Sequence, residues 1–252
     1  MPVAGQCRLC LKEGDLLKSH FMSRKLYHSG NKKLEFINRL ETGIDPEELK
    51  AHLLCRDCEH RFSVNGEAEV LKHVKPKYVL KPLPLGERMR VAWARDTDSS
   101  APRFDARDFD IDTEKFAYFA VSLVWRRTIH EWHSAIPRWE LGQIAEDMRR
   151  FLLGETQVSS NTAVLVMVCS DTMSRRIWMV PEHFDKLGCL NFSFTVRGIF
   201  FRVVIGRLPQ IIRDANCLAP HRPIFLADCE KRINEGWENT KMAQKANSEK
   251  QA

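Results

Sequence analysis

The sequence lacks several of the patterns that identify common classes of protein. No stretch reaches the roughly 18 apolar residues that a membrane-spanning helix needs. The first residues, "MPVAGQCRLC", have neither the apolar core nor the cleavage site of a secretory signal. A Gly-rich phosphate loop, a Gly-x-Ser-x-Gly elbow and a His-Glu-x-x-His helix are also missing, so the usual nucleotide-binding, serine-hydrolase and zinc-protease classes have no support. We therefore expect a soluble, cytoplasmic protein without a membrane partner.

Positive charge is present in modest excess and is unevenly placed. The net charge of +6 is compatible with a polyanionic partner, although it is small for a dedicated nucleic-acid binder. Residues 1–90 carry 17 Lys and Arg against 12 Asp and Glu, whereas the remaining 162 residues carry 22 against 21. The basic excess therefore lies in the N-terminal part of the chain.

Cysteine is the residue type with the most informative spacing. In a reducing compartment, eight cysteines in 252 residues argue against a disulfide framework and make closely paired ones candidates for metal ligands. Cys7 with Cys10, and Cys55 with Cys58, have the Cys-x-x-Cys spacing that lets one turn present both sulfurs to a tetrahedral zinc ion. The pairs predict a structural zinc site, and the alternative is two pairs of buried free thiols. The other cysteines have no chelating spacing and are expected to be buried: Cys169, Cys189, Cys217 and Cys229.

Composition divides the chain into four parts. Residues 1–75 carry the cysteine pairs and few long apolar runs, so a module of this size needs a metal to be stable. Residues 76–112 contain four prolines, which predict an extended connector. Residues 113–235 have the apolar patterns of a second domain, and residues 236–252 form a polar tail.

The second domain is predicted to begin with two packed helices. Asp112 or Thr113 can cap the first, which continues through "FAYFAVSLVWRRTIHEWH". Ser134 and Pro137 stand at the expected entrance of the second, and Gly154 stands at its exit.

Strands are predicted after the helices. Apolar runs at 162–169 and 176–180 are strand-like, and two such runs within 191–206 meet at Arg197-Gly198, where a hairpin turn is expected. Helices followed by antiparallel strands are typical of an α+β domain.

The spacing of motifs between the cysteine pairs resembles a known family. Ser19-His20 follows Cys10 by nine residues, and "LLCRDCEH" leads into a predicted helix. This arrangement is similar to the zinc-stapled branch of the HNH endonucleases, whose fold is a ββα-metal finger of the treble-clef type. The resemblance covers about residues 5–75 and implies an N-terminal HNH-like treble-clef zinc finger, which makes the whole chain α+β.

The resemblance also implies roles for individual residues. His20 matches the histidine that activates water as a general base. Glu59 stands where the family usually has its last histidine, and a carboxylate suits magnesium or manganese. His60 would be the ligand after a shift of one residue, so His20, Glu59 and His60 are the candidate catalytic residues.

Two positions depart from the family's pattern. Ser19 replaces the usual metal-binding acid, so replacing it by Asp is expected to raise activity if the site is an impaired nuclease and to change nothing if the module is only a scaffold. Lys50 stands near the position of the asparagine that orients the base, and His52 or Asn38 is a candidate substitute. For Glu59, the alternative is an ordinary acidic residue in the first turn of a helix.

Basic residues around the histidine are candidate nucleic-acid contacts, because Lys and Arg bind phosphates without reading sequence. Those singled out are Lys18, Arg24, Lys25, Lys32 and Lys33. Ordinary solvated surface charge is the alternative. Arg126, His130 and His133 share one face of the first predicted helix of the second domain, where a phosphate-binding or metal-binding stripe competes with a solvated polar face.

The sequence therefore predicts a metal-dependent nuclease that acts on DNA more readily than on RNA, with structural zinc and catalytic magnesium or manganese. The alternative is a catalytically inactive, zinc-stabilised module that binds nucleic acid, or a protein partner through its C-terminal domain.

Overall fold

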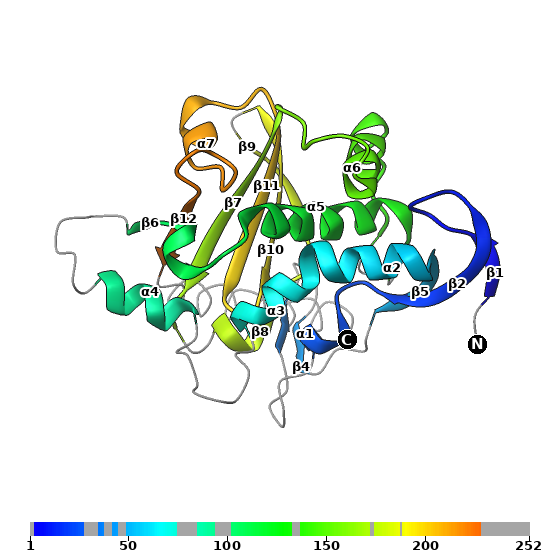
Figure 1. Cartoon of the computed structure of the whole chain (residues 1–252), viewed down its shortest axis with the longest axis horizontal. Coiled ribbons are helices and arrows are strands. Elements are labelled where there is room, and N and C mark those ends of the chain that lie inside the picture. The colour runs from blue at the N-terminus through cyan, green and yellow to red at the C-terminus, as the bar shows by residue number, and fades with distance from the viewer. Residues whose placement is uncertain are drawn as a thin grey trace, which may run out of the picture.

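The computed structural model describes residues 3–27, 35–37, 42–44, 49–74, 85–93, 102–132, 137–171, 174–186 and 188–227. Within these ranges, helices and strands both contribute, as the sequence predicts (Figure 1). The helical elements are α1 (Arg24–Tyr27), α2 (Arg56–Phe62), the π-helix η1 (Ser63–Glu67), α3 (Ala68–Val74), α4 (Leu85–Trp93), the 3-10 helix η2 (Ala106–Phe109), α5 (Thr113–Ile129), α6 (Gln143–Leu153), the 3-10 helix η3 (Ser174–Arg176) and α7 (Gln210–Asp214). Of the described helices, none combines the length and the apolar character that crossing a membrane requires.

Two sheets organise the described strands. A small sheet has the order β1-β2-β5, with β1 at Val3–Gln6, β2 at Glu13–His20 and β5 at Lys50–Cys55. The large sheet has the order β4-β3-β8-β10-β11-β7-β12-β6, and β9 pairs with β10 outside this path. Its strands are β3 (Glu35–Ile37), β4 (Thr42–Ile44), β6 (Arg103–Asp105), β7 (Thr162–Cys169), β8 (Ile177–Trp178), β9 (Glu182–Lys186), β10 (Cys189–Val196), β11 (Ile199–Gly206) and β12 (Pro223–Ala227).

The central hairpin of the large sheet confirms the prediction for residues 191–206. Strands β10 and β11 pair antiparallel from Cys189 with Gly206 to Val196 with Ile199. Arg197 and Gly198 form the turn with φ of 50° and 85°, the left-handed values that a two-residue hairpin turn requires. Most pairs in this sheet are antiparallel, but β7 with β12 and β3 with β8 are parallel.

The two packed helices of the C-terminal part are present, with one boundary corrected. Asp112 caps α5 by accepting a hydrogen bond from the Lys115 N–H at 3.1 Å, which decides between the two predicted caps. α6 ends at Gly154 as predicted, with φ of 79°. It begins only at Gln143, because Trp139 donates its N–H to the Arg127 carbonyl at 2.7 Å and holds the preceding segment against α5.

The proline-rich range also needs a correction. Its four prolines predict extended chain throughout 76–112, yet Leu85–Trp93 forms α4. This stretch follows Pro84 and contains no proline itself, so nothing interrupts its helical hydrogen bonds. β6 and η2 also lie within the predicted connector.

Helix α5 lies between the N-terminal helices and the large sheet (Figure 1). On one side it packs against η1 and α3, and on the other against β11. Gly66 permits the close approach of η1, because a Cβ atom there would lie 3.0 Å from the Cα of Phe119. Aromatic contacts continue on both sides: the ring centroids of Phe62 and Trp125 are 5.9 Å apart, and those of Phe119 and Phe201 are 5.5 Å apart. One apolar core therefore includes residues from both predicted domains. The division into a module at residues 1–75 and a domain at residues 113–235 stays a prediction.

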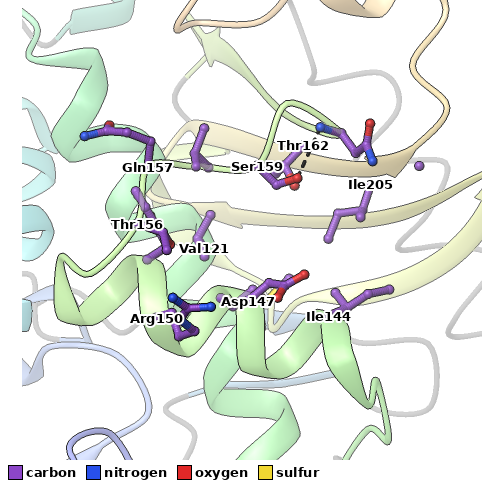
Figure 2. A pocket seen from close by; sticks show the side chains of 14 residues that line it. Val121, Ile144, Asp147, Arg150, Thr156, Gln157, Ser159, Thr162 and Ile205 are labelled. Atoms are coloured by element: carbon purple, nitrogen blue, oxygen red, sulfur yellow. Dashed lines mark hydrogen bonds between the residues drawn. The ribbon is translucent and has the colours of Figure 1, made fainter.

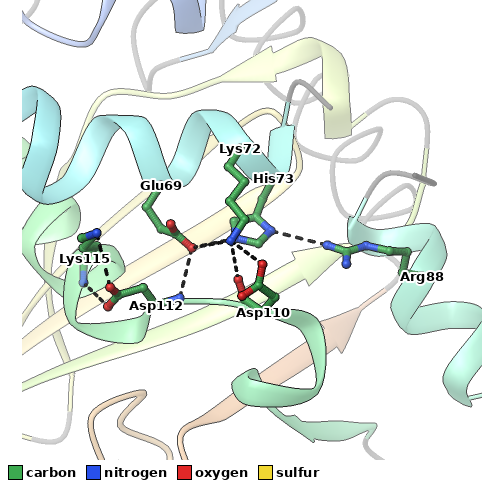
Figure 3. Close-up of polar contacts among 7 residues, drawn as sticks. All are labelled: Glu69, Lys72, His73, Arg88, Asp110, Asp112 and Lys115. Carbon is green, nitrogen blue, oxygen red and sulfur yellow. Dashed lines mark hydrogen bonds and ion pairs between the residues drawn. The ribbon is translucent and has the colours of Figure 1, made fainter. Parts of the chain in front are cut away.

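A polar network fixes the end of α3 against α4 and α5 (Figure 3). The buried imidazole of His73 donates from Nε2 to Glu69 Oε1 at 2.9 Å, and Arg88 donates to its Nδ1 at 3.5 Å. Glu69 also accepts the N–H of Asp112 at 3.0 Å, at the start of α5. Lys72 pairs with Asp110 at 2.6 Å. These contacts orient α3, which follows α2 and η1 in the chain, relative to α4 and the start of α5.

Candidate metal centre and the surroundings of His20

The two cysteine pairs lie at the ends of the small sheet. Cys7 and Cys10 stand in the turn between β1 and β2, while Cys55 ends β5 and Cys58 lies in the first turn of α2. A hydrogen bond from the Arg8 N–H to the Leu53 carbonyl, 2.9 Å long, holds the turn against β5. The pairs, 45 residues apart in sequence, therefore meet at one point.

The sulfur positions fit a tetrahedral metal. All four Sγ atoms lie within 4.8 Å of one another, and those of Cys10 and Cys55 are 3.9 Å apart. Four sulfurs at about 2.3 Å from a zinc ion would be separated by about 3.8 Å at tetrahedral angles. The cluster is therefore compatible with structural zinc, as the spacing predicts.

The protein already stabilises negative charge within the cluster. The Cys55 N–H donates to Cys7 Sγ at 3.4 Å. A hydrogen bond from the Cys58 side chain is the largest cause that lowers the pKa of Cys7, to about 4, and the same pairing raises the pKa of Cys58. A bound dication would provide the charge that lets the remaining thiols ionise as well.

Helix α6 supports the turn that carries Cys7 and Cys10 from outside. Arg149 donates from Nη1 to the Leu9 carbonyl at 2.7 Å and pairs with Glu146 at 2.7 Å. Arg61 on α2 donates to the Leu153 carbonyl at 3.0 Å. Each half of the cysteine cluster is thus tied to the same C-terminal helix.

His20 is the last residue of β2 and is half-buried. Its neighbours are fixed by hydrogen bonds: Ser19 Oγ accepts the N–H of Leu54 at 3.2 Å, and the Phe21 N–H donates to the Leu49 carbonyl at 2.8 Å. The backbone on both sides of His20 is therefore held against the segment that includes β5.

Two carboxylates, Glu59 on α2 and Glu67 on η1, interact electrostatically with each other, and Glu67 also with His20. Glu59 is half-buried, and its Oε1 has no hydrogen-bond partner among the described residues. Glu67 is 8% exposed, and burial raises its pKa. Arg126, by charge and by hydrogen bond, and the charge of His20 act to lower the pKa of Glu67, whereas the charge of Glu59 raises it further. Glu67 is not among the residues predicted from the sequence, because the π-helix that turns it inward leaves no recognisable sequence signal.

The other predicted metal ligands are not gathered in the same way. Within the described ranges, the four cysteines form the one group of three or more His, Cys, Asp or Glu side chains whose ligand atoms lie within 4.8 Å of one another. His60 is exposed on α2, whereas Glu59, one residue earlier, is half-buried. Of the candidate substitutes for the orienting asparagine, His52 donates from Nδ1 to the Leu16 carbonyl at 3.2 Å, and Asn38 lies outside the described residues.

Basic side chains lie on the ribbon formed by β2 and β5. Lys18 stands opposite His52, and His20 stands opposite Lys50. Directly opposed residues project to the same side of a sheet, as do residues two apart in one strand, so these four side chains share one face. The intervening residue, Ser19, belongs to the other face and is 1% exposed. Of the other predicted contacts, Arg24 and Lys25 are exposed on α1, and Lys32 and Lys33 lie outside the described residues.

No protein-family model, curated protein or solved structure matches the chain. The relation to the HNH endonucleases therefore stays a prediction that rests on the motif spacing.

Ser19 corrects one expectation drawn from that resemblance. Its side chain is buried rather than directed to a solvent-accessible metal site, and its oxygen satisfies the Leu54 N–H. We expect Ser19→Asp to lower the free energy of unfolding by more than about 2 kcal/mol, because it buries a charge. Chemical denaturation tests this, with Lys18→Ser on the exposed neighbour as a control expected to change stability by less than about 0.5 kcal/mol. A Ser19→Asp protein as stable as wild type and more active would show that this position reaches the metal after all.

Of the polar stripe predicted on the first C-terminal helix, the two described residues, Arg126 and His130, do not share an exposed helical face. Arg126 is 1% exposed, so it belongs neither to a solvated face nor to a phosphate-binding surface. α5 ends at Ile129, and His130 has extended backbone with φ of −154°, so helical spacing does not continue to it. His133 lies outside the described residues.

A pocket of about 470 Å³ lies away from these residues, between α6 and the end of β11 (Figure 2). Val121, Ile144 and Ile205 contribute apolar surface, and Asp147 and Arg150 lie on the α6 side. Neither His20 nor Glu59 lines it, so it has no part in the candidate site.

Proposed function

We propose that the chain is a metal-dependent nuclease of the HNH-like, treble-clef type, which hydrolyses phosphodiester bonds in DNA. The observation that carries the proposal is the order of elements around the cysteine cluster. A ligand-bearing turn between β1 and β2 is followed by the paired strands β2 and β5, and then by α2 with Cys58 in its first turn. Within this arrangement β2 ends at His20, and α2 carries Glu59 one residue after its last cysteine.

His20 is the proposed general base, which removes a proton from the attacking water. Glu59 is the proposed ligand for magnesium or manganese, and its half-buried position supports it over the exposed His60. If Glu59 holds such an ion, the ion would neutralise charge on the phosphate that is cut. Lys18 and Lys50, on the same face of the ribbon as His20, are placed to contact neighbouring phosphates.

The second candidate function is nucleic-acid binding without cleavage, and the same basic face supports it. Lys18, Lys50 and His52 can bind phosphates whether or not a second metal is present. In this case the zinc is purely structural, and the C-terminal part is free to bind a protein partner. The preference for DNA over RNA and a cytoplasmic location are proposals in either case.

A cleavage assay separates the two candidates. Zinc-loaded protein is incubated with supercoiled plasmid, and separately with a single-stranded RNA, with magnesium, with manganese or with neither. The nuclease proposal expects nicking of the plasmid that requires the added ion and exceeds RNA cleavage. Salt-dependent binding without cleavage on any substrate would contradict it and favour the second candidate.

A further inference from the structure

The segment that carries His20 is fixed not only by β5 but also by the C-terminal part of the chain. Arg126, near the end of α5, donates from Nη1 to the carbonyl oxygen of Phe21 at 2.6 Å. These residues are 105 positions apart in sequence. Phe21 directly follows His20, so this hydrogen bond holds the Phe21–Met22 peptide group, one residue after the proposed base.

The same guanidinium reaches the carboxylate cluster. Arg126 Nη1 lies 3.2 Å from Glu67 Oε1, and its Cζ lies 4.6 Å from the centre of the Phe62 ring on α2. The side chain is almost fully buried, and its Nε and Nη2 have no hydrogen-bond partner among the described residues. A buried cation is weak evidence for stability, because an apolar side chain of similar volume often serves a core at least as well. The contacts of Arg126 with the Phe21 carbonyl and the Glu67 carboxylate indicate instead that this side chain positions the segments it joins.

A second contact strengthens the link between α5 and the His20 segment. The Trp132 indole donates from Nε1 to the Arg126 carbonyl at 2.8 Å. Its ring packs edge-on against Phe21, with centroids 5.1 Å apart. Phe21 is therefore held by its carbonyl through Arg126 and by its ring through Trp132.

We propose that Arg126 is a positioning residue that sets the place of His20 by holding the Phe21 carbonyl while it pairs with Glu67. The inference rests on the proposed nuclease function and extends it, since the catalytic site then needs α5 as well as the zinc module. Arg126 acts through the backbone and does not touch the substrate.

The test compares Arg126→Gln and Arg126→Lys with Arg127→Gln in the full-length, zinc-loaded chain. Arg127 is a matched control: it is the next residue of α5, it is buried, and it donates to a backbone carbonyl, that of Pro137 at 3.1 Å. Its guanidinium stacks over Trp139 at 4.3 Å, away from the His20 segment. Both Gln variants remove a buried guanidinium, but only Arg126→Gln removes the guanidinium that donates to the Phe21 carbonyl.

Two measurements are made on each protein. The first is the rate of plasmid cleavage at saturating manganese over a range of plasmid concentrations, which separates kcat from KM. The second is hydrogen exchange of the Phe21 amide, which reports on the segment even without activity. We expect Arg126→Gln to lower kcat by about 10- to 100-fold, as a small misplacement of a catalytic group does, with KM within about twofold. We also expect its Phe21 amide to exchange faster.

Arg126→Lys should recover part of both effects, because an ammonium can donate to the Phe21 carbonyl but lacks the forked geometry. It also provides the comparison if the Gln variant does not fold. Arg127→Gln should keep kcat within about twofold and leave Phe21 exchange unchanged.

The remaining outcomes show whether the positioning role of Arg126 or the proposed nuclease function is wrong. If wild type cleaves and both Arg126 variants match its kcat, the positioning role is wrong while the nuclease function stands. If Arg127→Gln lowers kcat as much as Arg126→Gln, the effect is general destabilisation and the positioning role is again wrong. If wild type cleaves nothing, the proposed function is wrong, and Arg126 then has no catalytic group to position. Exchange at Phe21 then decides whether Arg126 fixes the segment at all.

Discussion

Cys58→Ser is expected to unfold the N-terminal elements of the chain. Binding of structural zinc contributes about 10–16 kcal/mol of apparent free energy in zinc-finger peptides, as much as the whole stability of a typical domain. Cys58 is buried at the start of α2, and its loss leaves three thiols that cannot complete a tetrahedral site. Because α2 leads into η1 and α3, which pack on α5, the loss should spread to the C-terminal part.

Circular dichroism, zinc content and hydrogen exchange measure this loss, and a strong chelator on wild type should reproduce it. Cys189→Ser is the matched control, since Cys189 is a buried thiol in β10, well separated in the sequence from the cysteine pairs. We expect it to retain zinc and to lose no more than about 1–3 kcal/mol of unfolding free energy. A fully folded, zinc-free wild-type protein would contradict the structural role of the metal.

His20→Ala is expected to abolish most cleavage while leaving the fold intact. A general base contributes about 10²–10⁴-fold to the rate, so kcat should fall by that factor at matched zinc content. KM should change little, because the basic residues that would hold the phosphates remain. Added imidazole should restore part of the rate by entering the space of the missing ring.

The control for this variant is His221→Ala, because His221 is exposed and precedes β12, outside the candidate site. Its kcat should stay within about twofold of wild type. Equal cleavage by His20→Ala and wild type would exclude His20 as the general base.

Local patterns predicted a large part of this structure. The Cys-x-x-Cys spacing predicted the cluster because each pair is formed within a single turn. The Arg197-Gly198 turn and the helix end at Gly154 were predicted for the same reason: each depends on the conformation of one or two residues. The boundaries of β7, at Thr162–Cys169, follow its continuous apolar run.

The remaining features depend on contacts between distant residues. Nothing in the sequence around Arg126 indicates that it would be buried against Phe21, 105 residues earlier. Ser19 resembles a substituted metal ligand until its hydrogen bond with the Leu54 N–H is known. Glu67 faces inward because η1 is a π-helix packed closely on α5 at Gly66. In each case tertiary packing, rather than residue type, determines the role.

The proposed site depends first on one zinc ion that fixes the strands and the helix carrying His20 and Glu59. X-ray absorption at the zinc edge of the purified full-length protein tests this most directly. We expect one zinc per chain with four sulfur neighbours at about 2.3 Å. A shell containing nitrogen or oxygen, or a folded protein with no zinc, would contradict it.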